Sequence, residues 1–152
     1  MIKANDPSIQ SWLDVPENSD FPIQNIPFGV FKSENVPARV GTRIGDQVID
    51  LNALFILGYL DNLPFTNGDF NTDSLNKIMK KGKKATSDLR NRISKLFNKE
   101  NNDLSSNAHH VQQVVFPVER VEMCMPVHVG DYTDFYSSRD HATNVGTMFR
   151  DP

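Results

Sequence analysis

The chain has 152 residues, of which 38% are hydrophobic and 23% are charged. This composition is typical of one globular domain and excludes fibrous and collagen-like proteins. Sixteen Lys and Arg against nineteen Asp and Glu give a net charge of −3, which argues against a general nucleic-acid binder because such proteins carry a basic excess. The single cysteine, Cys124, excludes an intramolecular disulfide and suits a reducing compartment.

Targeting and membrane signals are absent from the sequence. Residues 1–7 lack the apolar stretch of a signal peptide. The longest mainly apolar run, 51–60, is far too short to span a bilayer. We therefore expect a cytoplasmic protein that does not enter a membrane.

The first 27 residues form an arm rather than a helix, because four prolines are spaced along them. We expect Trp12 and Phe21 to fix this arm to the core. An apolar strand is predicted next, over residues 28–31.

A β-hairpin is the clearest local pattern. Residues 39–44 alternate, Gly45-Asp46 gives a two-residue turn with glycine first, and residues 47–51 return. One face of the first strand carries three residues that we expect to point the same way: Val40, Thr42 and Ile44.

Helical segments follow the hairpin. Residues 52–60 predict a short helix capped by Asn52, and 62–71 a loop. A helix capped by Asp73 runs to Gly82, which ends or kinks it. We expect it to bury Leu75, Ile78 and Met79 on one face. A second helix, 83–98, has an apolar stripe of Leu89, Ile93, Leu96 and Phe97.

The run Lys80-Lys81-Gly82-Lys83-Lys84 at the junction of these helices has two interpretations. Clustered lysines are typical of phosphate or nucleic-acid sites. No aromatic residue interleaves with them to stack on bases, which favours a solvated helix junction.

A polar loop over 98–107 leads to a strand-like stretch, 111–125, broken at Pro117. Proline cannot donate to a β-ladder, so at least one piece is expected at a sheet edge. Strands, then helices, then strands predict an α+β domain with a short barrel or curled sheet.

Residues 128–141 have a different character, with three Asp, two Tyr, two His and one Arg. Ser137-x-x-Asp140 resembles a capping box, and a helix that begins there would carry His141 forward to Gly146. If Asp134 belonged to the same helix, it would stand about 10 Å from His141 along the axis. If the helix began only at Ser138, Asp134 would lie on the preceding loop and could approach more closely.

These residue types suit one small site. A carboxylate such as Asp134 holds a hard cation, the imidazole of His141 moves a proton near neutral pH, and the guanidinium of Arg150 holds an anionic group. Tyr136 adds a phenol. Structural alternatives stay open: a helix cap for the Asp, a surface position for the His, and core packing for the aromatic residues.

A further alternative is a transition-metal site formed by Cys124, His109, His110 and His128, although no CxxC or HxxxH pairing is present.

Several stretches carry a family resemblance. The run 130–146, GDYTDFYSSRDHATNVG, resembles the signature of the fumarylacetoacetase family, whose members hydrolyse a carbon–carbon bond. Residues 18–31 and 44–51 are similar to the opening and the hairpin of that family's small N-terminal domain. The likeness covers most of the chain and is weakest over 72–107.

The resemblance implies a role for each matched residue. Asp134 would be a ligand of Ca²⁺ or Mg²⁺, Tyr136 and Arg150 would contact the substrate, and His141 would be the general base on the attacking water. The implied substrate is fumarylacetoacetate, which is cleaved to fumarate and acetoacetate in the last step of tyrosine and phenylalanine catabolism.

The resemblance also implies a fold and a division of the chain. We expect an SH3-like β-barrel with two or three helices over residues 1–120, and the truncated start of a mixed, β-rich catalytic domain over 121–152. Family members are homodimers about three times this long. Because Asp134 alone matches a metal ligand, we expect the isolated chain to bind metal weakly and to have little activity. A packing or interaction module with a vestigial catalytic strip is the alternative.

The last part of the chain, residues 114–149, leads to an expectation about exposed hydrophobic surface. If a parent sheet continues beyond Pro152, the apolar faces of residues 114–149 lack partners. The isolated chain should then expose hydrophobic surface and tend to associate.

Overall fold

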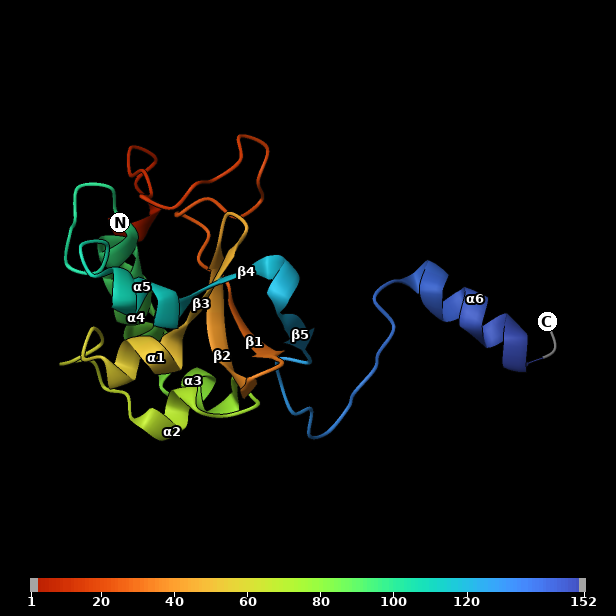
Figure 1. Cartoon of the computed structure of the whole chain (residues 1–152). Coiled ribbons are helices and arrows are strands. Elements are labelled where there is room, and N and C mark those ends of the chain that lie inside the picture. The colour runs from red at the N-terminus through yellow and green to blue at the C-terminus, as the bar shows by residue number, and fades with distance from the viewer. Residues whose placement is uncertain (1–2, 151–152) are drawn as a thin grey trace.

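The predicted hairpin is the centre of a five-stranded antiparallel sheet, shown in Figure 1 in a computed structural model that describes residues 3–150. The strands are β1 (Phe28–Ser33), β2 (Val36–Ile44), β3 (Gln47–Asp50), β4 (Val115–Pro117) and β5 (Glu122–Cys124), in the spatial order β4-β3-β2-β1-β5. The helices are α1 (Leu51–Ile56), α2 (Asn67–Phe70), α3 (Asn76–Lys80), α4 (Gly82–Phe97), α5 (Ala108–Val114) and α6 (Arg139–Phe149), with 3₁₀ turns at Lys3–Asn5 and Val118–Arg120.

The hairpin forms as its sequence predicts. Ile44 pairs with Gln47 across the turn, and Gly45 takes a φ of +55°, a value that glycine adopts without steric cost. The predicted face of β2 is buried, with exposures of 0% for Val40, 3% for Thr42 and 0% for Ile44. The alternation therefore identified the core face of this strand correctly.

The sheet is strongly curled. In a flat sheet, β4 and β5 would lie about 19 Å apart, at roughly 4.8 Å for each of the four strand spacings. Only residues 118–121 connect them, and three of these form a 3₁₀ turn that rises about 2 Å per residue. The curl brings the ring of Phe31 on β1 to 5.8 Å, between centroids, from the ring of Phe116 on β4. The concave face of the sheet thus has an apolar interior of its own.

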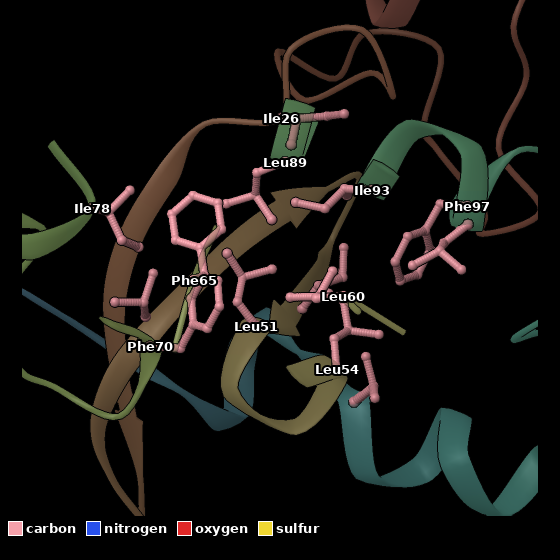
Figure 2. Packing of buried hydrophobic residues seen from close by; sticks show 14 of the residues in the cluster. Ile26, Leu51, Leu54, Leu60, Phe65, Phe70, Ile78, Leu89, Ile93 and Phe97 are labelled. Atoms are coloured by element: carbon pink, nitrogen blue, oxygen red, sulfur yellow. The ribbon is translucent and has the colours of Figure 1, made fainter. Parts of the chain in front are cut away.

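The convex face packs against the helices. Figure 2 shows side chains of α1, α2, α3 and α4 that meet in one cluster. The predicted stripe of α4 is fully in this core, with Leu89, Ile93 and Phe97 at 0% and Leu96 at 3% exposure. Gly82, with a φ of +80°, is the first residue of α4 and marks the break between α3 and α4, which confirms the prediction.

The N-terminal arm is fixed by the two aromatic residues expected to hold it. Trp12 stacks on Phe97 with 5.1 Å between ring centroids, and its indole N–H donates to the carbonyl of Leu96 at 2.9 Å. The guanidinium of Arg43 lies 4.0 Å from the ring centroid of Phe21, a cation–π distance. Both contacts tie residues 3–27 to the sheet and to α4.

Asp50, at the end of β3, joins the sheet to α1. Its side chain is fully buried; Oδ1 accepts the backbone N–H of Ala53 at 2.9 Å, and Oδ2 forms an ion pair with Arg39 at 2.6 Å. Asp50 is therefore the N-cap of α1. The predicted cap, Asn52, is wrong because the helix begins one residue earlier, at Leu51, which leaves Asn52 buried inside it.

Other helix ends also differ from the sequence prediction. The predicted helix to residue 60 stops at Ile56, because Gly58 takes a φ of +81°. Asp73 does not cap α3, whose N-cap is Leu75. Met79 is 62% exposed rather than buried, because within the short α3 only Ile78 points inward, next to the buried N-cap Leu75.

Two short helices were not predicted. α2 lies within the predicted loop, where the carboxylate of Asp69 accepts the N–H of Thr66 at 2.7 Å and pairs with Lys81 at 3.1 Å. α5 replaces the first part of the strand predicted over 111–125. It is capped by Asn107, whose side chain accepts the N–H of His110. The remaining parts, β4 and β5, both lie at sheet edges as the proline indicated.

The α+β class is confirmed, and the closed SH3-like barrel is not. Among residues 3–150 no ladder joins β4 to β5, so the sheet stays open between its two edges. Each edge strand has three residues, and Pro117 offers no N–H to a partner. Five helices, α1–α5, accompany the sheet within residues 3–128 instead of two or three. No helix in the described part of the chain is long and apolar enough to cross a membrane.

Asp50 should make stability depend on pH. Burial raises the pKa of this carboxyl to about 6, against the bonds from Ala53 and the charge of Arg39. Because the folded-state pKa lies above the ordinary 3.8, the stabilisation is fully present below about pH 4 and is lost as the pH rises through 6. Asp50→Asn removes this titration. The free energy of unfolding of the native chain minus that of the variant, from urea titrations, should fall by up to about 3 kcal/mol between pH 4 and 7. A difference that does not change with pH would contradict the assignment.

Candidate functional site

The segment that carries the candidate site, residues 129–150, lies apart from the rest of the protein. Figure 1 shows an extended stretch that leads from β5 to α6, which stands away from the sheet and the other helices. None of the residues of α6 is buried. This segment, called the strip (residues 129–150), is thus not packed against other parts of the chain within the described residues.

The strip leaves the folded body (residues 3–128) at a defined point. The N–H of Leu75 donates to the carbonyl of Pro126 at 2.8 Å. The amide of Asn76 bonds His128 twice, donating to its carbonyl at 2.9 Å and accepting its N–H at 3.1 Å. No motif in the sequence identified Asn76 as this anchor, because the two segments lie about 50 residues apart and meet only in the fold.

α6 begins one residue later than the predicted capping box. Ser138, in extended conformation, is the N-cap, and its hydroxyl accepts the N–H of His141 at 3.1 Å. The helix includes Gly146 and continues to Phe149. Asp134 therefore lies on the preceding segment, which is the second of the two geometries considered from the sequence.

The helix start brings Tyr136 and His141 together. Their rings are in edge-to-face contact with centroids 5.4 Å apart, and Nδ1 of His141 lies 3.5 Å from the hydroxyl of Ser137. Both side chains are exposed to solvent, so the imidazole can reach a water molecule or a ligand. This pair is the part of the predicted site that the chain assembles by itself.

The other two predicted residues are not brought to this pair. Arg150 is the C-cap of α6, nine residues from His141, which corresponds to about 14 Å along the helix axis. Asp134 is exposed on the irregular segment. No group of three His, Cys, Asp or Glu side chains within residues 3–150 is arranged to hold a metal ion. A site for Ca²⁺ needs six to eight oxygen ligands, so the residues present do not fit the metal on their own.

The alternative transition-metal residues are each engaged elsewhere. Nδ1 of His110 bonds the hydroxyl of Tyr59 at 2.8 Å, and His109 bonds Gln113 at 2.7 Å. Nε2 of His128 lies 3.5 Å from a carboxylate oxygen of Asp73. Cys124 packs against the hydrophobic core. His109 and His110 are neighbours with ring centroids 6.4 Å apart, but within residues 3–150 no third ligand joins them to form a metal site.

The lysine run is solvated, as the absence of aromatic residues indicated. Lys80, Lys81, Lys83 and Lys84 are exposed. Lys84 pairs with Asp88 at 2.7 Å, and Lys81 with Asp69 at 3.1 Å. The charges of the run are therefore partly balanced by carboxylates next to them.

Comparison with known proteins decides the family. A sequence model described as the N-terminal domain of fumarylacetoacetase matches residues 24–126. The chain belongs to the fumarylacetoacetase family. Fumarylacetoacetase of Dictyostelium discoideum is 41% identical over 143 residues, which cover 93% of this chain and 34% of the relative. The Arabidopsis thaliana protein is 38% identical over 146 residues, and the Homo sapiens protein 39% over 142.

The family model covers part of the sequence that carried the resemblance: it includes residues 24–31 and 44–51, and it ends before the run 130–146. It includes the hairpin, the curled sheet and helices α1–α5, and it ends two residues before the anchor at His128. The chain spans about a third of the length of these fumarylacetoacetase relatives.

The separation of the strip from the body leads to a stability prediction. A chain that ends at His128 should have the same free energy of unfolding as the full chain, within about 0.5 kcal/mol, because residues 129–150 bury nothing against the body. A chain that ends at Val121 loses β5 and the carbonyl of Pro126, and should lose about 2 kcal/mol or more. Urea unfolding measures both. A large loss on removal of the strip alone would contradict the geometry.

Proposed function

We propose that this chain is the N-terminal third of a hydrolase that cleaves the carbon–carbon bond of fumarylacetoacetate, giving fumarate and acetoacetate at the end of tyrosine and phenylalanine catabolism. The observation that carries the proposal is 38–41% identity to fumarylacetoacetases along 93–95% of the chain. The exposed pair of Tyr136 and His141 supports it, because it offers a base and a phenol at the surface of a strip that the body does not use for packing.

In this proposal His141 is the general base. Its ring is held at the first turn of α6 by the Ser138 cap and by the edge of Tyr136, with Nδ1 near the hydroxyl of Ser137. The imidazole takes a proton from water, and the water oxygen attacks a carbonyl carbon of the substrate. The carbon–carbon bond then breaks, and the acetoacetate carbon takes up a proton.

Tyr136 and Arg150 are the proposed substrate contacts. The phenol of Tyr136 lies beside the base and can hydrogen-bond a substrate oxygen. The guanidinium of Arg150 suits one of the carboxylates of fumarylacetoacetate, because its planar fork matches a carboxylate with two hydrogen bonds. Arg150 and His141 lie about 14 Å apart along the helix axis. This separation suits two side chains that act on different parts of one active site rather than on the same substrate atom.

We also propose Asp134 as one oxygen ligand of Ca²⁺ or Mg²⁺. Because residues 3–150 do not group three such ligands, the remaining ligands would come from the part of the longer relatives that follows this chain. The same part of the longer relatives would form the homodimer interface. The proposed location of the protein is the cytoplasm. We propose that residues 1–120 form the N-terminal domain and that residues 121–152 begin the catalytic domain.

A second candidate is a packing or interaction module with a vestigial strip. The observation that favours it is the self-contained body, whose sheet and core are complete without residues 129–150.

The exposed surface expected near the end of the chain is present. Eight large apolar side chains between positions 123 and 149 are exposed: Met123, Met125, Val129, Tyr132, Phe135, Tyr136, Met148 and Phe149. Val114, at the start of the region expected to be unpartnered, is instead fully buried in the core.

A chimaera tests the two candidates. This chain replaces the matching third of the Dictyostelium discoideum fumarylacetoacetase, and turnover of fumarylacetoacetate is followed by its absorbance. The chimaera should be active, and His141→Ala should lower kcat by about 10²- to 10⁴-fold, the usual contribution of a general base. His128→Ala, a control histidine that contacts Asp73, should leave kcat unchanged. An inactive chimaera would favour the vestigial strip, and full activity with His141→Ala would contradict the assignment of His141 as the base.

The isolated chain should bind metal weakly. Titration calorimetry with Ca²⁺ or Mg²⁺ should give a Kd of about 1 mM or weaker, because a single carboxylate replaces few of the water ligands of the ion. Asp134→Asn should change the heat of binding little in this chain, and should lower affinity in the chimaera. Micromolar binding by the isolated chain would show a metal site that the described residues do not form.

A further inference from the structure

The concave face of the curled sheet contains a pocket that the proposed function does not use. Its volume is about 230 Å³, and it lies between β1, β2 and β3, the 3₁₀ turn and β5. The side chains that line it are mainly apolar and include Phe21, Phe28, Phe31, Val48, Val118 and Met123. This volume is much larger than the water-sized spaces that protein interiors usually leave unfilled.

Two glycines that face each other on adjacent strands line the pocket. Gly29 of β1 pairs directly with Gly41 of β2. Gly41 is required by packing, since a Cβ there would lie 2.7 Å from the ring of Phe31 and 2.9 Å from the carbonyl of Ile49. Gly29 has no such requirement, because its Cβ would meet only the terminal methyl of Met123, at 3.0 Å.

Gly29 therefore keeps space open that only a flexible side chain covers. Glycine inside a strand weakens it, and such a position often marks the close approach of a ligand. Met123 belongs to the edge strand β5 and is 56% exposed, so its thioether chain can move aside.

The polar groups around the pocket are already engaged. The hydroxyl of Thr42 donates to the carbonyl of Pro27 at 2.7 Å. The guanidinium of Arg43 donates to the carbonyl of Gly45 at 2.8 Å, pairs with Asp46 at 3.0 Å, and covers the ring of Phe21. The charge of Arg43 is paired with Asp46, the hydroxyl of Thr42 is engaged, and the rest of the lining is mainly apolar, which favours a neutral apolar ligand over an anion or a sugar.

We propose that this pocket binds a small, neutral, apolar molecule about the size of one aromatic ring, with Met123 as its movable cover. An apolar cavity of roughly 150 Å³ is known to stay dry and to bind benzene, so the volume here is sufficient for a substituted ring. The pocket and the strip share no residue, and the proposal goes beyond the proposed hydrolase activity.

The experiment uses the full chain with ¹³C-labelled methionine methyls and 4-fluorotoluene as the probe. The methyl signal of Met123 should shift with saturation as the probe is added, and the ¹⁹F signal of the probe should broaden. The methyl of Met79, which is exposed on α3, should not shift and is the internal control. Equal shifts at Met79 and Met123, or no saturable shift at Met123, would overturn the proposal.

Variants at the glycines make the test specific. Gly29→Val should weaken binding by about tenfold or more, because the new side chain occupies the volume that the ring needs. Gly130→Val is the matched control, since nothing lies within 4 Å of that position. If Gly29→Val loses its folded methyl spectrum, Gly29→Ala, which meets only the methyl of Met123, replaces it and should weaken binding several-fold. Native affinity in a folded Gly29 variant would overturn the proposal.

Discussion

The buried carboxylate of Asp50 connects most of what defines this fold. It ends β3, caps α1 and holds the guanidinium of Arg39 on β2, so the hairpin and the first helix share one charged group. A buried pair of this kind is costly to form, and removal of one partner leaves an uncompensated charge. The direction in which the chain leaves the sheet is therefore fixed at one residue. The turn of α1 against the convex face then brings Leu51 and Leu54 into the core.

Local patterns predicted the hairpin and the apolar stripe of α4 because the determining residues lie close together in sequence. Alternation with period two identified the buried face of β2, and the spacing of Leu89, Ile93 and Leu96 identified that of α4. Helix ends were predicted less well. Asn52 and Asp73 are both good caps by residue type, but α1 begins after the extended Asp50, and α3 begins after Leu75, which is already in the right-handed helical region. The open edge between β4 and β5 depends on contacts between distant strands, which no local pattern encodes.

The sequence predicted the candidate site in two ways, from its residue types and from a resemblance to a family. Within that site, contacts that are local in sequence form in this chain, and contacts between distant residues do not. The edge-to-face contact of Tyr136 with His141 is local to one helix start, so it forms within this chain. The relation of both residues to Asp134 and Arg150 is not local, because α6 holds Arg150 far along its axis and an irregular segment carries Asp134. The family resemblance implies a role for each of the four residues, while this chain brings only two of them together.

The contrast between the body and the strip follows from where apolar area is buried. Residues 3–128 enclose the hydrophobic cluster and an additional, smaller interior within the curl of the sheet. The strip carries large aromatic side chains among its polar residues, with Tyr132 at 82% and Phe135 at 79% exposure, and within the described residues it has no surface to bury them against. Exposed aromatic side chains in such number are typical of an interface. The exposed aromatic side chains of the strip are therefore available to an interface, and this chain spans about a third of the length of the relatives it matches.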